Sequence, residues 1–555
     1  MNLNFKKYLV ICLAIAFVAS QVTPGVDPIA AKVIPKPKTY TFGTQTLKIS
    51  NPCNIVYRPQ VNQAGYVPDH VFQMINLYSN LTFQSTFNST NCNFVSSNIK
   101  QMLNAFDPSN IIFDIFISDM NLTIADTIQD ESYSLNLLNS SYWQLNATKY
   151  VGFVRGLETF SQLFVQDEVS SAWSIPSLPI SIQDSPDYPY RGLMIDTARH
   201  FLSVNTILKT IDSMQYNKLN VLHWHITDDD SFPYPLQSFP NVTQYGAFSF
   251  RKQYSLTDIQ YIVRYALLRG IQVVPEIDSP GHAFSWGKSP QFSNVALQCD
   301  KFNGQLDPSQ KETWQLVNGV LTDLENQFYT SKYIHLGGDE VDEGCWDQSS
   351  DLKQYMKDNN IQNYDDLQTF YRQTQKNLYR KINPTKPAIY WSDKDNYKLG
   401  LQPDDIVQWW GEMSNFKLIS NITNRIILSS QDYAYLDVGF GDELGGDYNQ
   451  MYNWKAMYAF NPQISGIKGK IIGAEVCLWS ELSDDDVYLT RIWTRTSAFS
   501  ERLWNLNASN GQKLKYRALA SRMVFMKNRL NARGVKATPV TLEICERDLS
   551  LCFSN

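Results

Sequence analysis

The sequence predicts an α/β protein, a (β/α)₈ TIM barrel preceded by a smaller α+β domain. The chain of 555 residues exceeds the roughly 100–200 residues of one domain, and 43% hydrophobic residues suffice for a sizeable core. From residue 190 onward, short apolar segments alternate with longer amphipathic ones, as in a parallel barrel. The 48 basic and 54 acidic residues give a charge of −6, which offers no electrostatic surface for nucleic acid.

Residues 1–20 have the pattern of a secretory signal peptide. Lys6 and Lys7 precede ten consecutive apolar residues, Leu9 to Val18, and the small pair Ala19-Ser20 follows. Ten residues are too few for a bilayer core of ~30 Å, which needs about 20. We therefore expect a protein of the secretory pathway without a membrane span.

The cysteines and glycosylation sequons fit that route. Cys12 leaves with the signal peptide, and Cys477 stands in an apolar run, which predicts a buried free thiol. Proximity in the sequence favours the pairs Cys53–Cys92, Cys299–Cys345 and Cys545–Cys552. No C-x-x-C pair exists, which disfavours a structural zinc site. Eight N-x-[ST] sequons stand at Asn80, Asn88, Asn121, Asn139, Asn146, Asn241, Asn421 and Asn507.

Residues 21–186 predict the smaller, non-catalytic α+β domain. Short apolar alternations over Ile111–Ile117 and Tyr133–Leu137 indicate strands, and Val154–Val165 has helical spacing. The proline-bearing segment Ser185–Pro189 reads as a short linker.

Residues 187–555 predict the barrel. Helical spacing over Val204–Tyr216 and Thr257–Arg269 separates the first three strands. The eight expected strands are Gly192–Asp196, Asn220–Thr227, Ile271–Asp278, Tyr333–Glu340, Ala388–Asp393, Ile406–Trp410, Ile426–Ser430 and Ile471–Glu481. Active sites of such barrels lie at the C-terminal strand ends.

The expected strand ends are dense in carboxylates, tryptophans and one arginine. Tryptophan faces stack on the apolar side of a pyranose, and carboxylates and arginine bind its hydroxyls, so the set suits a carbohydrate. The sharpest local feature is Gly337-Gly338-Asp339-Glu340, where two glycines let the backbone approach a ligand and two carboxylates follow.

Five ordered motifs carry a family resemblance. They are Arg191–His200 (RGLMIDTARH), Asn220–Asp229 (NVLHWHITDD), Pro275–His282 (PEIDSPGH), His335–Glu340 (HLGGDE) and Gly473–Trp479 (GAEVCLW). They resemble the β-N-acetylhexosaminidases of glycoside hydrolase family 20, particularly the eukaryotic lysosomal type. The resemblance implies exo-acting removal of terminal non-reducing GlcNAc or GalNAc from glycans, without a metal or other cofactor. It also implies a lysosomal or secreted homodimer.

The adjacent acids fit the family's substrate-assisted mechanism. Successive side chains of an extended segment diverge, so neighbouring carboxylates cannot readily flank one glycosidic bond. By resemblance, the substrate's acetamido oxygen attacks C1, Asp339 holds the acetamido N–H, Glu340 protonates the leaving oxygen, and Tyr435 orients the acetamido group. We expect a low-dielectric pocket to raise the pKa of Glu340, and hence an acidic optimum.

The resemblance also assigns substrate-binding residues. Arg199 matches the arginine on O3 and O4, Glu481 the carboxylate on O4, and Asp437 the one near O6. The aromatic walls match Trp391, Trp410 and Trp479, and Asp228 and His282 match residues that tune the proton of Glu340.

Two positions bear on specificity. A carboxylate at Asp437 would repel a 6-sulfate, so neutral termini are the expected substrates. Ser392-Asp393 stands where the family commonly has Gln-Glu, and this departure concerns the leaving-group side.

Three alternatives compete with this interpretation. A metal-dependent hydrolase would use His223, His225 and Asp228, but only six histidines exist and none lies beyond His335. A glycan-binding protein on a degenerate barrel would lack Asp339 or Glu340, and both are present. A chitin-degrading endo-enzyme with an open groove stays open on the sequence alone.

Overall fold

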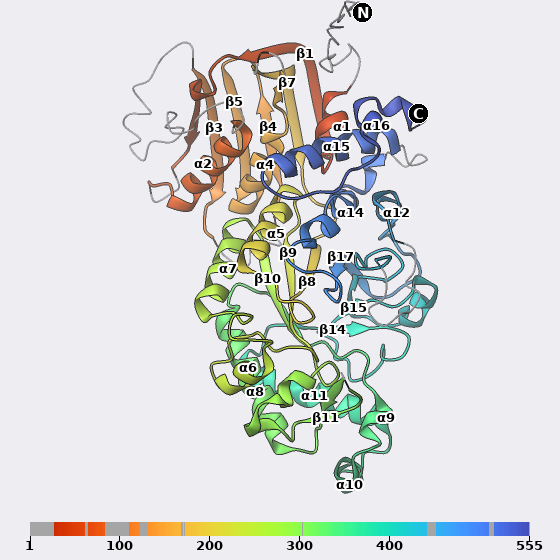
Figure 1. Ribbon diagram of the computed structural model, residues 1–555. Helices are drawn as coiled ribbons and strands as arrows, with labels where there is room; N and C mark the ends of the chain where they lie inside the picture. The colour runs from red at the N-terminus through yellow and green to blue at the C-terminus, as the bar shows by residue number, and fades with distance from the viewer. Residues whose placement is uncertain are drawn as a thin grey trace, which may run out of the picture.

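The computed structural model describes residues 27–61, 65–83, 110–122, 130–167, 170, 172–301, 303–440, 451–509 and 516–553. It contains an N-terminal sheet unit and a closed barrel that lie against each other (Figure 1). The expected signal peptide, Asn88 and Cys92 lie outside the described residues. Among the described helices, none is long and apolar enough to cross a membrane.

The N-terminal unit is a mixed seven-stranded sheet of order β1-β7-β4-β5-β3-β2, with β6 paired to β7. Its strands are β1 Thr39–Ile49, β2 Ile55–Pro59, β3 Ile111–Asp119, β4 Tyr133–Leu137, β5 Tyr142–Lys149, β6 Val165–Gln166 and β7 Trp173–Asp184. Helices α2 (Asp69–Phe83) and α4 (Tyr150–Ser161) lie on one face (Figure 1). Between them and the sheet, Phe113, Trp143 and Phe160 pack edge to face or tilted.

The α4 helix differs in position from the expected Val154–Val165. It begins at Tyr150 and ends at Ser161. Every residue of the helix is buried, and its first turn has no polar face, so the spacing of apolar and polar residues does not show where the helix begins.

The second unit is a closed parallel barrel of order β10-β13-β14-β15-β16-β17-β8-β9. All eight expected segments contribute a strand: β8 Tyr190–Asp196, β9 Val221–Thr227, β10 Gln272–Ile277, β13 Ile334–His335, β14 Ala388–Ser392, β15 Ile406–Trp409, β16 Arg425–Leu428 and β17 Lys470–Leu478. Most strand residues are buried, as expected for parallel strands that helices cover.

The fourth barrel strand is much shorter than the expected Tyr333–Glu340. It ends at His335 because Gly337 and Gly338 take φ of +60° and +93°, which no strand allows. The segment with Asp339 and Glu340 is therefore a loop above the barrel.

Helices surround the barrel (Figure 1). Helix α5 spans the expected Val204–Tyr216 with Ser203 as N-cap, and α7 (Leu256–Leu268) begins after a capping box at Ser255. The others are α1 Pro28–Lys32, α6 Pro240–Gly246, α8 Lys311–Gln327, α9 Glu343–Trp346, α10 Ser350–Asp358, α11 Tyr364–Ile382, α12 Trp454–Ala459, α13 Tyr488–Ile492, α14 Arg495–Trp504, α15 Tyr516–Ala532 and α16 Glu543–Arg547. A small two-stranded sheet, β11 (Ala296–Gln298) with β12 (Gly304–Leu306), precedes α8.

The C-terminal helices join the two units. Helix α15 lies beside α1 (Figure 1), where Arg522 donates to the carbonyl of Ala30 at 2.7 Å. Trp504, at the end of α14, is fully buried in the core of the N-terminal unit.

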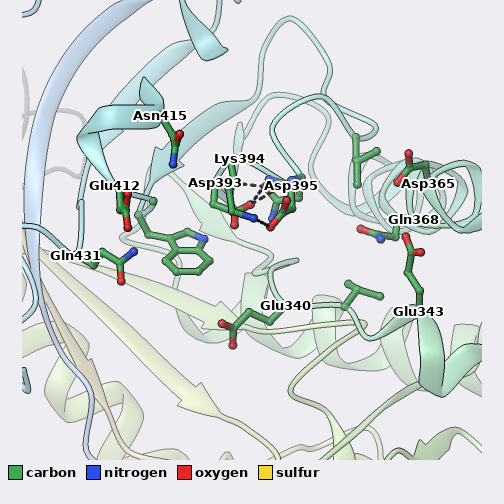
Figure 2. A pocket seen from close by; sticks show the side chains of 15 residues that line it. Glu340, Glu343, Asp365, Gln368, Asp393, Lys394, Asp395, Glu412, Asn415 and Gln431 are labelled. Carbon is green, nitrogen blue, oxygen red and sulfur yellow. Dashed lines mark hydrogen bonds and ion pairs between the residues drawn. The ribbon is translucent and has the colours of Figure 1, made fainter. Parts of the chain in front are cut away.

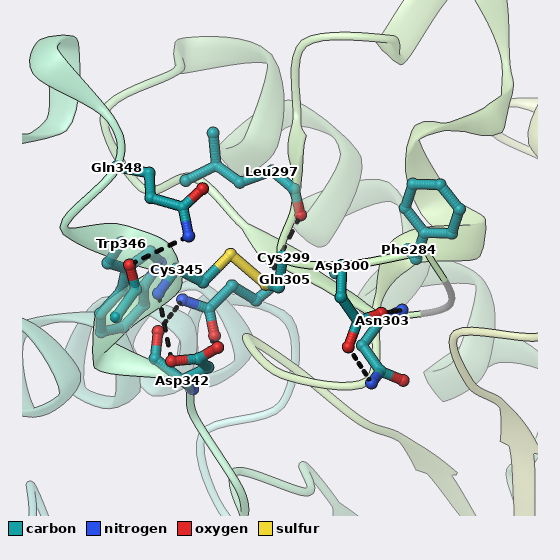
Figure 3. The surroundings of a disulfide bond; sticks show 12 residues. Phe284, Leu297, Cys299, Asp300, Asn303, Gln305, Asp342, Cys345, Trp346 and Gln348 are labelled. Atoms are coloured by element: carbon teal, nitrogen blue, oxygen red, sulfur yellow. Dashed lines mark hydrogen bonds between the residues drawn. A yellow bond between two sulfur atoms is a disulfide. The ribbon is translucent and has the colours of Figure 1, made fainter. Parts of the chain in front are cut away.

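The structure joins Cys299 to Cys345 with an S–S distance of 2.09 Å (Figure 3). Cys345 lies in α9, directly after the loop that carries Glu340. Beside the disulfide, the Gln305 side chain exchanges two hydrogen bonds with the backbone of Asp342, at 2.7 and 2.9 Å. Together these contacts fix the far end of the Glu340 loop.

The remaining cysteines and sequons are placed as follows. Cys545 is joined to Cys552, and Cys477 is a buried free thiol, while the partner expected for Cys53 lies outside the described residues. Asn121, Asn139, Asn241, Asn421 and Asn507 are exposed, and Asn80 and Asn146 are half-buried. Their occupancy stays a prediction.

Candidate active site

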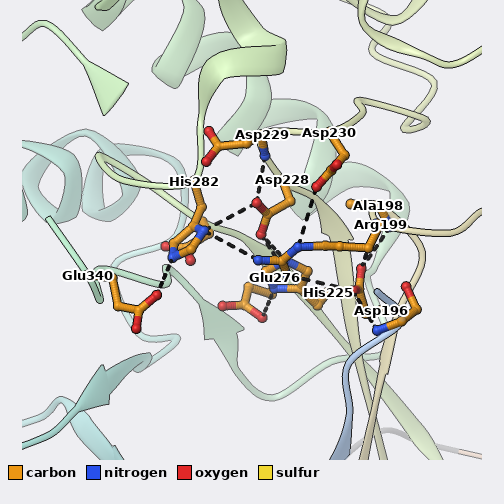
Figure 4. Close-up of polar contacts among 12 residues, drawn as sticks. Asp196, Ala198, Arg199, His225, Asp228, Asp229, Asp230, Glu276, His282 and Glu340 are labelled. Atoms are coloured by element: carbon orange, nitrogen blue, oxygen red, sulfur yellow. Dashed lines mark hydrogen bonds and ion pairs between the residues drawn. The ribbon is translucent and has the colours of Figure 1, made fainter. Parts of the chain in front are cut away.

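A continuous polar chain crosses the C-terminal end of the barrel (Figure 4). Arg199 Nη1 contacts Asp228 Oδ2 at 2.8 Å. The other oxygen of Asp228 lies 3.2 Å from His282 Nδ1, and His282 Nε2 lies 3.3 Å from Glu340 Oε2. The loops after β8, β9, β10 and β13 thus bring these four side chains into one row.

The two middle side chains of this polar row, Asp228 and His282, favour their charged forms. Burial disfavours ionisation of Asp228, but Arg199 and His282 hold the pKa of its carboxyl well below the usual range. Burial likewise opposes a charge on His282, but Asp228 and Glu340 raise the pKa of its imidazole well above the ordinary value. At neutral pH this shift favours an imidazolium on His282, which lies between two carboxylates and beside Arg199 Nη2 at 3.4 Å.

Glu340 departs from expectation. Its side chain is 60% exposed, and the hydrogen bond from His282 lowers the pKa of its carboxyl. The expected raised pKa is wrong for the free molecule, because the group faces an imidazolium and water rather than a closed apolar pocket.

Asp339 has the opposite environment. It is 8% exposed, and burial, with a smaller contribution from Glu340, raises its pKa to about 6. Its Oδ1 has no hydrogen-bond partner among the described residues. Burial and the nearby Asp339 also raise the pKa of Asp278 well above its ordinary value. Asp339 thus offers a buried acceptor oxygen beside the exposed Glu340.

Below this chain, Glu276 ties together the upper layer of the barrel. Its carboxylate contacts His225 Nδ1 at 2.7 Å, His335 Nδ1 at 3.1 Å and Trp391 Nε1 at 2.6 Å. All four side chains are fully buried. Because the second nitrogen of His225 lies 2.9 Å from Asp228, this layer also supports the polar chain above it.

Aromatic side chains form the floor and one side of the candidate site. Trp391 is fully buried and presents no exposed face, whereas Trp410, Trp479 and Tyr435 pack around it partly exposed. The guanidinium of Arg199 lies 5.1 Å from the Trp479 ring.

The last strands supply two more carboxyls. Burial raises the pKa of Asp437 to about 7 and that of Glu481 to about 7, and the Oδ1 of Asp437 has no partner in the described part of the chain. Tyr435 pairs with Cys477 in a parallel bridge, which brings this segment beside β17.

A family model described as "Glycosyl hydrolase family 20, catalytic domain" matches residues 188–507, more than half of the chain. The chain belongs to this family. It is therefore a glycoside hydrolase, and a second model, "beta-acetyl hexosaminidase like", matches residues 33–163 of the N-terminal unit.

Curated relatives and solved structures agree with this membership. The hydrolase is 36% identical to "Beta-hexosaminidase subunit beta" of Rattus norvegicus over 75% of this chain and 76% of that one. It is 32% identical to "Beta-hexosaminidase subunit A1" of Dictyostelium discoideum over 94% and 92%. The Flavobacterium johnsoniae chitobiase structure shares the fold, with a TM-score of 0.74 and 23% identity over 92% of this chain and 74% of that one.

In this family 20 hydrolase, a cavity of about 630 Å³ opens beside Glu340 and Trp410 (Figure 2). Its other walls come from α9, the start of α11 and the loops after β14 and β15. Sequence reasoning missed Glu343, Asp365, Gln368 and Glu412 here, because no motif marks them and they meet only in the folded chain.

Three groups in the described part could hold a metal ion: His223/Glu276/His335, Asp228/Asp229/His282 and Asp278/His282/Asp339. In the first, the carboxylate of Glu276 contacts both imidazoles directly, at 2.9 and 3.1 Å. Although burial opposes its charge, Glu475 and Glu276 raise the pKa of His223 to about 9, whereas burial lowers the pKa of His335.

Proposed function

We propose that the hydrolase is an exo-acting β-N-acetylhexosaminidase that removes terminal non-reducing GlcNAc or GalNAc from glycans with retention. The observation that carries the proposal is the contrast between adjacent acids. Asp339 is buried with an open acceptor, and Glu340 is exposed toward the cavity. Asp339 can accept a hydrogen bond from the acetamido group, while Glu340 can protonate the leaving oxygen.

In the first step, the acetamido oxygen attacks C1 as the bond from C1 to the leaving oxygen breaks. Glu340 donates its proton to that oxygen, and a cyclic oxazolinium forms. Asp339, ionised, accepts the acetamido N–H and stabilises the positive charge, while Tyr435 donates to the acetamido oxygen. A well-aligned intramolecular attack is worth ~7–11 kcal/mol.

Glu340 and His282 share the proton that Glu340 would donate. The contact of 3.3 Å between His282 Nε2 and Glu340 Oε2 lets the two groups hold one proton between them, with Asp228 fixing the imidazole. A leaving-group sugar that covers the exposed carboxyl removes water from it and moves the proton toward Glu340. In the second step Glu340 takes a proton from water, which attacks C1 and reopens the oxazolinium.

The remaining assignments describe the sugar pocket. Arg199 and Glu481 would bind O3 and O4, Asp437 would lie near O6, and Trp410 and Trp479 would flank the ring over Trp391. An ionised Asp437 would disfavour a 6-sulfate, because like charges repel in a pocket of low dielectric.

Kinetics of Asp339→Asn and Glu340→Gln on aryl N-acetyl-β-glucosaminides test the roles. Glu340→Gln should lose about 10²–10⁴-fold in kcat/KM with poor leaving groups and little with good ones. Asp339→Asn should lose about 10²–10³-fold with all of them. Asp351→Asn, an exposed change on α10, is the matched control. An inverted first product, or equal rates on substrates without the amide, would contradict the proposal.

We further propose a lysosomal or secreted homodimer whose catalytic unit begins at residue 187. The signal-like segment 1–20 and the sequons support the secretory route. Light scattering of the secreted protein would test the dimer, and N-terminal sequencing would test cleavage after Ser20.

A further inference from the structure

The cavity beside Glu340 is strongly acidic. Six carboxylates line it, from Glu340, Glu343, Asp365, Asp393, Asp395 and Glu412. Its single lysine, Lys394, already contacts Asp395 at 2.5 Å. Glu343, Asp365, Asp393 and Glu412 have no basic partner within ion-pair distance among the described residues.

Figure 2 shows how these carboxyls surround the cavity. Glu412 lies on one side, Asp365 and Glu343 on the other, and Asp393 and Asp395 between them, with Glu340 facing the group. Burial and the nearby Asp365 raise the pKa of Glu343, as expected where like charges share a space.

The cavity lies on the leaving-group side. Glu340 and Trp410 are on its wall, whereas Arg199, Asp437 and Glu481 are not. A sugar whose oxygen takes the proton of Glu340 must therefore enter this cavity, while the sugar that is cleaved lies over Trp479.

Two polar groups in the wall lack partners, which points to a bound polar ligand. Gln368 is only 7% exposed and lines the cavity, and its side chain forms no hydrogen bond in the described part of the chain. Figure 2 shows its amide directed toward the space near Glu343. The indole N–H of Trp410 is also buried and without an acceptor. A buried N–H without an acceptor, such as that of Trp410, costs free energy, and a ligand hydroxyl that accepts from it would recover this cost.

We propose that this cavity is a binding site for a 2-amino-2-deoxyhexose leaving group with a free, protonated amine, and that it rejects a uronic acid there. The inference rests on the proposed function, since it names the sugar that follows the cleaved bond. The unpaired carboxylates attract the ammonium group, and Gln368 and Trp410 supply hydrogen-bonding groups for hydroxyls. Asp393 belongs to this acidic wall.

Three synthetic β1,4-linked disaccharides test the site, each with GlcNAc at the non-reducing end. The second sugar is glucosamine, GlcNAc or glucuronic acid, and hydrolysis is followed at pH 6 in low salt. We expect kcat/KM to fall in that order, by about tenfold or more between amine and uronate. In 0.5 M NaCl the spread should shrink severalfold, because salt screens exposed charges.

A triple variant, Asp365→Asn, Asp393→Asn and Glu412→Gln, removes three charges and keeps similar shapes. The amine-to-uronate ratio should fall at least about fivefold in this variant, and Asp351→Asn should leave the ratio unchanged. If the triple variant does not fold, the single variants and the salt dependence of the native enzyme carry the test. Equal rates on all three disaccharides, or an unchanged ratio in the folded triple variant, would overturn the proposal. A native enzyme that does not cleave aryl N-acetyl-β-glucosaminide would instead overturn the proposed function.

Discussion

Glu340 and His282 face each other across 3.3 Å, and both take positive φ, +47° and +56°. Such backbone is unusual for residues with a side chain and turns each one out of the direction of its neighbours. Asp339 therefore stays buried while the next residue reaches the imidazole. The identity of the acids follows from the motif, but which partner sets the pKa of Glu340 depends on this local turn.

The pKa of about 6 for Asp339 predicts a limb of the pH profile. In the proposed mechanism Asp339 must be ionised to accept the acetamido N–H, so kcat/KM on an aryl N-acetyl-β-glucosaminide should rise with pH through about 6. At higher pH, loss of the proton shared by His282 and Glu340 should lower it. The optimum is then weakly acidic to neutral.

A profile of initial rates at low substrate concentration measures both limbs. Asp351→Asn should reproduce the native curve, since this exposed residue lies on α10 outside the site. An ascending limb centred below pH 4.5 would contradict the raised pKa of Asp339.

At the residue scale, sequence motifs marked the residues that we propose for the sugar pocket, and the structure brings them to one end of the barrel. Arg199, Asp228 and His282 could be predicted because each stands in a run of recognisable residues. Glu412 and Gln368 could not, since one lies in a loop after β15 and the other on α11. Their shared cavity depends on loop paths that no local pattern encodes.

At the scale of elements, the turn after β13 controls the site. The amide of Gly338 donates to Asp278 Oδ1 at 2.7 Å, and Gly337 packs so closely that an added Cβ would lie 1.8 Å from the same oxygen. The apolar run correctly predicts a strand here, but Gly337 and Gly338 end that strand early. The resulting loop carries Asp339 and Glu340.

Gly337→Ala should therefore disrupt the loop that carries Asp339 and Glu340. Its φ of +60° is strained for alanine, and the overlap with Asp278 forces the loop to move, so we expect at least a 10²-fold loss of kcat/KM. Gly466→Ala is a matched control, because it has φ of +80° and no heavy atom within 4 Å of an added Cβ. Gly466→Ala should cost about 1 kcal/mol in unfolding free energy and leave kcat/KM near native. Similar kinetics for both variants would show that the close approach of Gly337 is unimportant.

At the scale of the molecule, buried charges connect the two units. Lys218, which precedes β9, contacts Asp184 of β7 at 2.9 Å, and both side chains are fully buried. Arg191 of β8 likewise pairs with Glu131 of the N-terminal unit at 2.6 Å. The motifs predicted two units and a short linker, but these pairs span distant segments and have no sequence signature.

Removing one partner of such a pair should destabilise the whole enzyme. Asp184→Ala leaves the Lys218 ammonium buried without its counter-ion and should cost about 3–5 kcal/mol in unfolding free energy. The cost should fall on both units together, because Trp504 also donates to Asp184 at 2.9 Å from the C-terminal helices. Urea unfolding followed by tryptophan fluorescence and by residual activity measures this loss of stability.

Glu543→Ala is the control, because it breaks an exposed ion pair with Arg547. The side chains of Glu543 and Arg547 are 81% and 65% exposed, so the change should cost less than about 1 kcal/mol. Equal losses for the two variants would contradict a structural role for the buried pair.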